Sequence, residues 1–580
     1  MRRFTYALLA LFLCAAGARA QNVPVQEVVL DNGLRVLMVP RKGDPNISAG
    51  WITRTGSVNE RPGITGLSHL FEHMMFKGTR AIGTKNIEEN LKVLKEMDNV
   101  RAQIRSEEKE LIRRARLGEV ADTKDPKVRS ARHQQLITRF DELTKLEREL
   151  MVKNEFDSIY TKAGGSGMNA GTSNDFTVYF INVPANKLEL WFWMESDRLL
   201  NPVFREFYSE RDVVHEERRL RTDSTPTGKF DEQFDAMFWM SSPYGWPVVG
   251  WPSDLEGITR EEALEYFAVN YAPNNLTAAL VGDFEPGRAT ELARKYFGRL
   301  PRGPREPEPV RTREMQQLAE QRMVAYAETN PQARVRYHTV ADGHPDDVAL
   351  SVLGSLLSGR TGRLYKSLVT QQEVANNASG GQNGSKYEGY FELRGTAKPG
   401  KSPEEVELAL YKEIERIQKE PVPVDELQKI KNQSAANQFR GLQSNFGLMV
   451  QLLLRDANRG WATINTDPAR VQAVAPADIQ RVANKYFAPE NRTVAIYRTK
   501  QAVAGGAAED PELAGLSDAE KAQVRQLRAM LPQMKAEQVR AVLQQVGQMG
   551  ASAPADKQKG VQLVKKMLED RLKQLEGGVK

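Results

Sequence analysis

Two histidines and a glutamate lie within five residues of one another in the segment HLFEH. His69 and His73 are four residues apart, and Glu72 directly precedes the second histidine. On a helix this spacing puts both imidazoles on one face, about a turn apart, where they can hold one zinc ion. Glu72 then lies beside the same face and can accept a proton from a metal-bound water, whose pKa zinc lowers to about 7. The motif therefore predicts hydrolytic zinc chemistry.

A pair of surface histidines beside an acid is the simpler interpretation of the same motif. Apolar residues recur at helical spacing on both sides of it, between Gly63 and Thr79, and glycines flank the segment. We therefore expect a short helix that buries one face and stops by Gly78. A helix held in this way presents its polar face in a fixed position, which favours the metal site over free surface histidines.

A catalytic zinc site usually takes three protein ligands, and none of the other histidines has a suggestive spacing. The segment ERDVVHEERRLR offers three carboxylates, Glu210, Glu216 and Glu217. Glu210 and Glu217 are seven residues apart and would share one helix face, whereas Glu216 would point about 100° away from Glu217. A solvated helix face is an equally simple origin for each acid, so the residues alone leave the third ligand open.

The motif and its surroundings resemble the pitrilysin/insulinase family of zinc metallopeptidases, which includes the mitochondrial processing peptidase and its bacterial relatives. H-x-x-E-H is the inverted zincin (inverzincin) signature. The matching segments, spread over most of residues 25–499, are GLSHLFEHMMFKGT, GGSGMNAGTSNDFTVYF, NPVFREFYSERDVVHEERRLR, SPYGWPVVGWPSDLEGITREEALEYFAVNYAPNNLTAALVGDFEP and SGRTGRLYKSL. The third ligand in that family is the second glutamate of an E-(six residues)-E pattern. The resemblance therefore implies that Glu217 binds the metal and that Glu210 supports the site.

The resemblance also implies the activity. It predicts a zinc endopeptidase that hydrolyses extended peptides, with one zinc ion per chain held by His69, His73 and Glu217 and with Glu72 as the base. A non-catalytic peptide-binding protein or partner subunit on the same fold is the alternative. The intact H-x-x-E-H motif and Glu217 argue against that alternative, because a degenerate copy needs none of these residues.

Substrate binding is implied by the family in the same way. The strand DFTVYFINV would pair with the peptide by β-augmentation, with Asn169 and Ala170 near the scissile bond. Many family members also place an arginine and, seven residues later, a tyrosine in the segment that reads LYKSLVTQQEVANNAS here. Those positions hold Val369 and Asn376. Valine has no hydrogen-bond donor to replace the arginine, and asparagine is much shorter than tyrosine. Two hypotheses follow: a heteromeric partner of the same fold supplies the anchor, or the chain works alone or as a homodimer by backbone pairing.

The resemblance implies an α+β fold, a duplicated clamshell in which each half packs antiparallel sheets against helices. An internal repeat supports the duplication, because NYAPNNLTAALV (residues 270–281) aligns with YFAPENRTVAIY (residues 486–497). Two apolar runs around Asn32-Gly33 also predict a β-hairpin near the start. The second copy has no H-x-x-E-H, as expected of a degenerate half.

A charged helical region, residues 86–160, separates the motif from the remaining family segments. Between His73 and Glu217 lie 143 residues, roughly twice the usual family spacing, and this region accounts for the excess. Its apolar residues recur at three- and four-residue steps on either side of ADTKDPK, which predicts an antiparallel pair of helices of about 40 Å each. We expect this hairpin to bury its apolar stripes chiefly against itself, as a solvated insertion more than as a partner-docking arm.

The ends of the chain differ from its middle. Residues 1–20 have two arginines, an apolar run and Ala-Arg-Ala, which predicts a cleaved secretory signal peptide and a periplasmic or secreted protein. Cys14, the single cysteine, falls within it, and no later stretch is apolar enough to anchor the chain in a membrane. The expected domains are a catalytic half (21–300, with the hairpin at about 86–160), a linker (301–314), a degenerate half (315–500) and an Ala/Gln-rich helical tail (501–580).

Composition excludes two further classes. Apolar residues make up 40% and charged residues 27% of the chain, which is typical of a globular protein and not of a disordered one. The formal net charge is +6, and three of these positive charges lie in the signal peptide. The remainder is close to neutral, so we expect no nucleic-acid partner.

Overall fold

The computed structural model describes residues 22–500 and, of the C-terminal segment, residues 516, 520–521, 524, 527–528, 531, 534, 536–550 and 558–577. The predicted signal peptide (residues 1–20, with Cys14) lies outside the described residues. By its contacts the chain divides into two compact units, Met1–Thr499 and Lys500–Lys580. The larger unit contains both halves of the duplicated fold.

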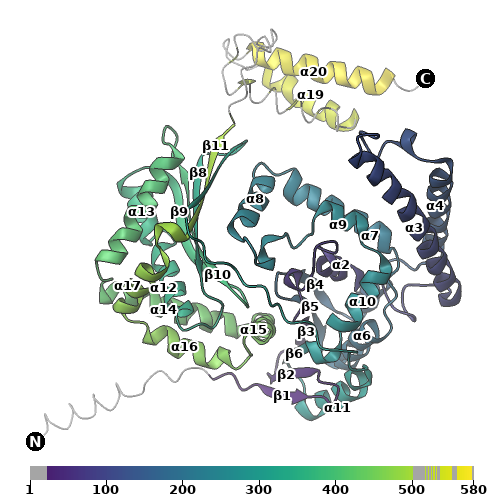
Figure 1. Ribbon diagram of the computed structural model, residues 1–580, viewed down its shortest axis with the longest axis horizontal. Coiled ribbons are helices and arrows are strands. Elements are labelled where there is room, and N and C mark those ends of the chain that lie inside the picture. Colours follow the sequence, from purple (N-terminus) through teal and green to yellow (C-terminus); the bar gives the residue numbers. More distant parts are fainter. Residues whose placement is uncertain are drawn as a thin grey trace, which may run out of the picture. The chain divides into compact units, whose positions relative to one another are not determined.

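The first half is built on a six-stranded sheet in the order β1-β2-β6-β3-β5-β4 (Figure 1). Its strands are β1 (Gln26–Val29), β2 (Arg35–Pro40), β3 (Asn46–Thr53), β4 (Ser166–Thr172), β5 (Thr177–Pro184) and β6 (Leu276–Gly282). The predicted hairpin joins β1 to β2, and Gly33 adopts the left-handed conformation (φ +92°) that its turn requires. Residues of β2 alternate between two apolar clusters, Val36 and Met38 on one face and Leu37 and Val39 on the other.

Helices cover this sheet and carry the candidate site. They are α2 (Leu67–Met74), α5 (Glu155–Lys162), α6 (Leu188–Leu200), α7 (Phe207–Arg218), α8 (Gly228–Phe238), α9 (Pro252–Gly257), α10 (Arg260–Asn270) and α11 (Pro286–Tyr296). The expected helix around H-x-x-E-H is α2, which ends four residues before Gly78. Glu60 is buried and accepts hydrogen bonds from the backbone N–H groups of Gly66 and Ser68, which satisfies two of the free donors where α2 begins.

The second half repeats the arrangement. Its sheet has the order β7-β11-β8-β10-β9, made of β7 (Gln321–Ala327), β8 (Gln332–Thr339), β9 (Ala375–Gly384), β10 (Gly389–Ala397) and β11 (Arg492–Thr499). Its helices are α12 (Asp347–Leu357), α13 (Pro403–Lys419), α14 (Val424–Gln443), α15 (Asn445–Asn458), α16 (Thr463–Ala473) and α17 (Pro476–Tyr486). The repeated sequence forms equivalent structures, because a 3₁₀ turn at Pro273–Asn275 opens β6 and one at Pro489–Asn491 opens β11.

The predicted fold class, a duplicated two-half α+β fold, is confirmed, but neither sheet is purely antiparallel. β6 runs parallel to β2 and antiparallel to β3, and β11 runs parallel to β7 and antiparallel to β8. In each half the last strand inserts between two strands that run in opposite directions. Such a strand must be parallel to one of its neighbours, so the duplication itself imposes one parallel pair on each sheet.

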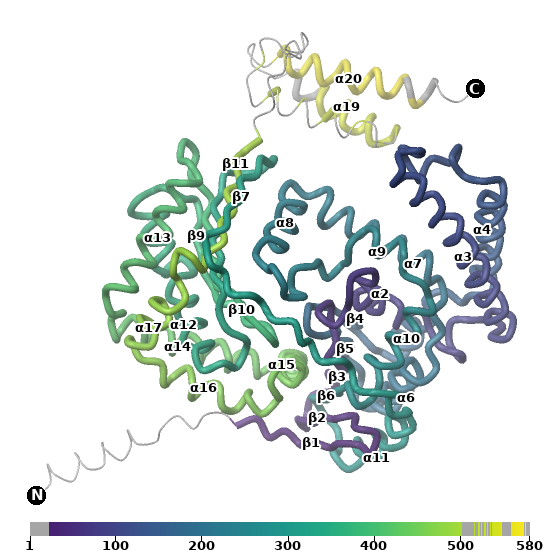
Figure 2. Tube along the Cα trace, in the orientation of Figure 1, coloured from purple at the N-terminus to yellow at the C-terminus, as the bar shows by residue number. Residues whose placement is uncertain are grey.

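The inserted helical hairpin is present as α3 (Ile87–Arg116) and α4 (Ala131–Leu150), two helices that pack side by side (Figure 2). At about 1.5 Å per residue, α3 is about 45 Å long and α4 about 30 Å long. The two arms pack chiefly on each other, as expected. Their buried residues are nevertheless continuous with the core cluster of the first half, and they include Val93, Leu94, Met97, Val100, Ile104 and Leu143.

Helix α15 of the second half packs against the sheet of the first half. Leu448, Met449 and Leu452 of α15 are fully buried in one cluster with Leu37 of β2 and Val178 of β5. The side chain of Asp456 on the same helix pairs with Arg35 and Arg54 of the first half. One face of the first sheet is therefore covered by a helix of the second half.

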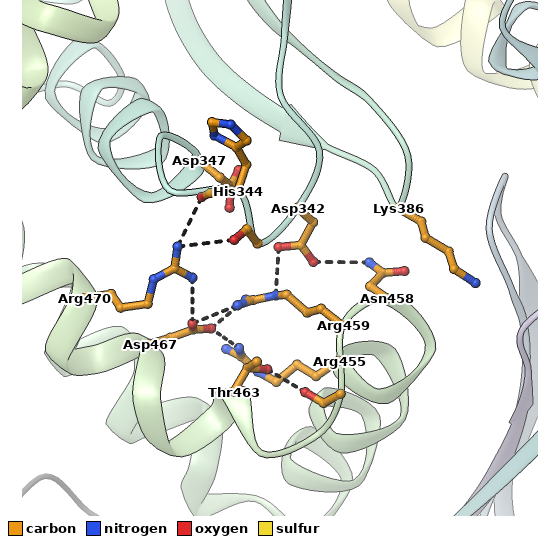
Figure 3. Close-up of polar contacts among 12 residues, drawn as sticks. Asp342, His344, Asp347, Lys386, Arg455, Asn458, Arg459, Thr463, Asp467 and Arg470 are labelled. Atoms are coloured by element: carbon orange, nitrogen blue, oxygen red, sulfur yellow. Dashed lines mark hydrogen bonds and ion pairs between the residues drawn. The ribbon is translucent and has the colours of Figure 1, made fainter. Parts of the chain in front are cut away.

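A polar network holds α15 within the second half (Figure 3). Asp467 of α16 accepts hydrogen bonds from Arg455 and Arg459, and Arg459 also pairs with Asp342 in the loop after β8 at 2.9 Å. Arg470 donates to the backbone carbonyl of His344 in the same loop at 3.1 Å. The network connects the C-terminal end of α15 and the middle of α16 to the loop after β8.

The C-terminal unit contains α19 (Ala536–Gly550) and α20 (Gln558–Gly577). They pack against each other, and Val539 and Leu568 are buried in their shared apolar cluster. Among the described residues, no helix combines the length and the apolar character that crossing a membrane requires.

Candidate metal centre

The helical period of α2 separates its core side from its chemical side. Leu67, Leu70, Phe71 and Met74 are buried in the core of the first half. His69, Glu72 and His73 occupy the other side of the helix, as their spacing requires. The imidazole rings of the two histidines lie 5.0 Å apart, centre to centre. The sequence pattern thus places the three residues of the motif on one face.

Glu217, at the end of α7, faces both histidines. Its Oε1 lies 3.6 Å from Nε2 of His69, and its Oε2 lies 3.3 Å from Nε2 of His73. The ligand atoms of the three residues all lie within 4.8 Å of one another, and no other such group occurs among the described residues. Two imidazole nitrogens and one carboxylate are the ligands that a catalytic zinc site uses, so the donor set fits that ion.

The other two candidate acids lie elsewhere on α7. Glu216 is exposed and pairs with Arg219 at 2.8 Å, so it points to solvent. Glu210 lies behind the site, where its Oε1 is 3.0 Å from Nδ1 of His73. In the neutral ring, a proton on Nδ1 that is donated to Glu210 leaves Nε2 of His73, the nitrogen that faces Glu217, available as a ligand.

Two basic residues near the ligands had no signal in the sequence. Lys77 follows α2, and its ammonium lies 2.5 Å from Oε2 of Glu210. Arg221 lies in a π-helical turn (η4, Arg219–Asp223) that continues α7, and its guanidinium is 2.6 Å from Oε1 of Glu217. If residues 207–223 are treated as one regular α-helix, this turn is not predicted.

The surroundings of the two histidines shift their pKa values in opposite directions. Burial, followed by the positive charges of His73 and Arg221, lowers the pKa of His69 to about 3. Burial also acts to lower the pKa of His73, but the hydrogen bond and charge of Glu210 and the charges of Glu217 and Glu72 outweigh it and raise that pKa. His69 is therefore neutral at physiological pH, the form that binds a metal ion.

Glu72 is held by a residue on the neighbouring strand. Thr172, the last residue of β4, donates its hydroxyl to Oε2 of Glu72 at 2.6 Å. Thr172 belongs to the segment GGSGMNAGTSNDFTVYF that resembles the family, but local sequence does not indicate a role for its hydroxyl. The hydrogen bond fixes the carboxylate beside the two histidines.

The prediction that the strand DFTVYFINV receives a substrate is wrong. That strand is β5, which pairs with β3 on one side and β4 on the other, so it has no free edge. Asn169 and Ala170 lie on β4, which is the last strand of the described sheet. The N–H of Ala170 donates to the side chain of Asn169 at 2.8 Å. The alternation of apolar residues in β5 marked a buried strand, and periodicity alone does not distinguish a central strand from an edge strand.

A cavity of about 410 Å³ opens beside these residues. Glu72, His73 and Glu210 line part of it, next to Phe76 and Lys77. Residues 151–156, which include the connection from α4 to α5 and the first two residues of α5, supply much of the remaining lining. The cavity has room for a large amino-acid side chain beside the metal centre.

The two positions that break the family pattern lie in the second half. Val369, in a π-helical turn, is partly buried against the core of that half. Asn376, on β9, is exposed, and its amide group donates to the carbonyl of Ala397 at 3.4 Å. Among the described residues, no hydrogen bond or ion pair joins either residue to the metal centre.

Comparisons with known proteins agree with the fold. The chain matches the family model described as Insulinase (Peptidase family M16) over residues 35–107 and the model described as Peptidase M16 inactive domain over residues 257–434. It is 26% identical to the zinc protease PqqE of Helicobacter pylori over 489 residues, which cover 82% of this chain and 94% of that protein.

Two solved structures show the same architecture. A protease from Helicobacter pylori superposes with a TM-score of 0.66 at 23% identity, covering 82% of this chain and 99% of the other. The periplasmic protease PqqL from Escherichia coli superposes with a TM-score of 0.59 at 15% identity, covering 83% of this chain and 48% of the other.

Proposed function

Because the chain belongs to the pitrilysin/insulinase (M16) family of peptidases, we propose that it is an exported zinc endopeptidase that cleaves extended peptides. The observation that carries the proposal is the convergence of His69, His73 and Glu217 beside Glu72. In this proposal the second half is catalytically degenerate. Its match to an inactive-domain model supports that assignment.

The proposed ligands are His69, His73 and Glu217. A zinc ion held by them would lower the pKa of a water molecule to about 7 and polarise the carbonyl group of a peptide bond. Glu210 accepts the Nδ1 proton of His73 and so keeps Nε2 of that ring available as a ligand. Lys77 neutralises the second oxygen of Glu210, so the partly buried carboxylate is paired on both sides.

Glu72 is the proposed general base and acid. Its carboxylate takes the proton from the attacking water and returns it to the nitrogen of the leaving amine. Thr172 holds one carboxylate oxygen and leaves the other for the water. A fixed base removes the cost of orienting a side chain at each turnover.

Substrate binding is proposed at the edge of β4. An extended peptide adds to such an edge through backbone hydrogen bonds, whatever its sequence. Asn169 and Ala170 lie on the strand that also carries Thr172, three and two residues before it, so the added peptide would pass close to Glu72. The cavity lined by Phe76 and residues 151–156 would receive one of its side chains.

Two partner hypotheses remain for the second half. Since Val369 and Asn376 cannot supply the family's arginine and tyrosine, a heteromeric partner of the same fold could bring them. Pairing at β4 could also suffice, in which case the chain works alone or as a homodimer. Assaying the purified chain with and without a co-expressed candidate partner separates the two, because full activity of the lone chain removes the reason for a partner.

Zinc content and peptidase activity test the central proposal together. The purified wild-type chain should bind one zinc ion and cleave a library of unstructured peptides. Glu72→Gln should keep the metal and lose turnover by several orders of magnitude, since base and metal act as a unit. His69→Ala, His73→Ala and Glu217→Ala should each lose the metal.

The same measurements distinguish the alternative, a non-catalytic peptide-binding subunit. That protein would bind peptides with no turnover that depends on Glu72 or on zinc. Full zinc stoichiometry in Glu217→Ala would reject the third ligand proposed here.

A further inference from the structure

The helical hairpin (α3 and α4) contacts the start of α7, the helix that carries Glu217. Five consecutive residues, Arg205 to Ser209, contain the turn into α7 and its first residues. Four of them make side-chain or backbone contacts with α3 or α4, and these contacts involve Asn90, Asp98, Phe140, Glu147 and Arg148. A hairpin that only extended into solvent would not require these contacts with the start of α7.

The central contact is made by Glu147 of α4. Its Oε1 accepts a hydrogen bond from the backbone N–H of Glu206 at 2.7 Å, and its side chain is almost fully buried. Glu206 directly precedes α7 and adopts the left-handed conformation (φ +54°), which is rare for a residue with a side chain. A backbone in this conformation persists only where its surroundings hold it. Glu147 supplies part of that support.

Tyr208, in the first turn of α7, provides a second contact. Its hydroxyl donates to Oδ1 of Asp98 on α3 at 3.1 Å. Its ring meets Phe140 of α4 edge to face, with 5.3 Å between ring centres. Both arms of the hairpin therefore hold the same turn of α7.

A short chain of charged groups leads from this turn to the metal centre. The carboxylate of Glu206 lies 3.2 Å from the ammonium of Lys77, and the same ammonium lies 2.5 Å from Glu210. Glu210 in turn holds Nδ1 of His73 at 3.0 Å. Movement of Glu206 would therefore displace the group that orients a proposed ligand.

The far end of α7 is anchored separately. Arg218 makes two hydrogen bonds to the carboxylate of Glu232 and one to the carbonyl of Gly250, all within the first half. Loss of the hairpin contacts would thus tilt or fray the helix at its start, where Glu210 lies, and would leave the end near Glu217 attached.

We propose that the inserted hairpin is a positioning element of the metal centre and that Glu147 is its principal positioning residue. The hairpin sets the entry of α7 and, through Glu206, Lys77 and Glu210, the orientation of His73. This inference rests on the proposed function, because it assumes that His73 binds zinc. It assigns a role to the part of the chain that separates His73 from Glu217.

Zinc affinity and hydrogen exchange of full-length protein test the inference. Glu147→Ala should weaken zinc binding by about 10- to 100-fold, the usual cost of losing a group that orients a ligand. The dissociation constant is measured by competition with a chromophoric chelator. Glu147→Gln, which keeps an oxygen that can accept from Glu206, should restore most of the affinity. Glu142→Ala, an exposed acid on the same helix, is the matched control and should bind zinc as the wild type does.

Hydrogen exchange supplies a readout that needs no metal. In metal-free protein, the amide of Glu206 and those of the first turn of α7 should exchange faster in Glu147→Ala than in Glu142→Ala. If Glu147→Ala fails to fold, Tyr208→Phe replaces it, since it removes one hydroxyl and keeps the ring packing. Wild-type zinc affinity and wild-type exchange in the tested variant would overturn the inference. A wild-type chain that binds no zinc would instead reject the proposed function, while the exchange comparison still tests whether the hairpin holds α7.

Discussion

Both ring nitrogens of His73 lie close to a carboxylate, Nδ1 to Glu210 and Nε2 to Glu217. In His69 only Nε2 does, close to Glu217. Nδ1 of His73 contacts Glu210, while Nδ1 of His69 is buried and has no hydrogen-bond partner within the described part of the chain. Histidines that bind metals almost always donate their second N–H to a neighbour, which fixes the ring and raises its basicity. The orientation of the proposed site therefore depends mainly on the His73 side.

Replacing Glu210 should show this dependence. Glu210→Ala removes the acceptor of the His73 N–H, and zinc affinity should fall by about 10- to 100-fold. Glu210→Gln keeps a neutral acceptor and should fall between that variant and the wild type. Zinc competition assays measure both. Equal affinity in all three proteins would show that Glu210 does not orient the ligand.

Thr172 should affect turnover without affecting the metal. Thr172→Val keeps the shape of the side chain but removes a hydrogen bond to a charged carboxylate, worth about 1.5–3 kcal/mol. If that bond positions Glu72 in the transition state, kcat should fall by about 10- to 100-fold while zinc content stays at one per chain. A change in zinc content, or an unchanged kcat, would contradict this role.

At the scale of elements, the metal centre depends on three pieces that are far apart in sequence: α2, α7 and the edge strand β4. The first two meet because the apolar faces of α2 and α7 share one core, which contains Phe71 and Val214. β4 meets them through Thr172. Each piece supplies a different function in the proposal: two ligands and the base, the third ligand, and the substrate edge.

The pairing edge of β4 can be blocked without touching the ligands. Ala170→Pro removes the N–H that donates to the neighbouring Asn169 side chain, and it adds a ring on the edge strand. We expect zinc binding to be retained and kcat/KM to fall by about tenfold or more, mostly through a higher KM. Wild-type kcat/KM in a variant that binds zinc normally would place the substrate elsewhere.

The sequence predicts features that depend on a few adjacent residues better than it predicts contacts between distant segments. The spacing of H-x-x-E-H fixed the face of α2, because a helical period needs only a few adjacent residues. The contacts of Lys77 and Arg221 depend on where the chain leaves α2 and α7, and Arg221 lies in a π-helical turn that periodicity does not reveal. The hairpin shows the same limit: its charged faces suggested independence, although Val93 and Met97 pack into the main core. Burial against a distant element has no signature in local composition.

At the scale of the whole larger unit, the two halves are held together by polar pairs as well as by α15. Asp231 and Asp235 on α8 pair with Arg334 and Arg336 on β8. α8 follows the π-helical turn that continues the ligand helix α7, so the contacts between the halves lie close in sequence to Glu217. Conditions that weaken the α8–β8 contact should therefore lower the Tm of the whole unit.

His338 of β8 makes this contact sensitive to acid. Its ring stacks on Phe238 of α8, 3.9 Å centre to centre, and neither ring nitrogen has a hydrogen-bond partner among the described residues. Burial lowers the pKa of His338 from 6.5 to about 4, against the opposing charge of Glu314. Between these two pH values the unfolded chain binds a proton that the folded chain does not. The contribution of His338 to stability is therefore complete above pH 6.5 and is lost as the pH falls toward 4.

Replacing this histidine should remove one part of the acid sensitivity. His338→Phe keeps an aromatic ring on Phe238 but cannot be protonated, so its Tm should fall less than that of the wild type between pH 7 and pH 5. The scans are made in the presence of a chelator, because protonation of His69 and His73 would otherwise release metal and obscure the comparison. His344→Asn is the control, since His344 is exposed and lies outside the α8–β8 contact. A loss of Tm in His338→Phe as large as that in the wild type and the control would mean that other groups account for the acid sensitivity.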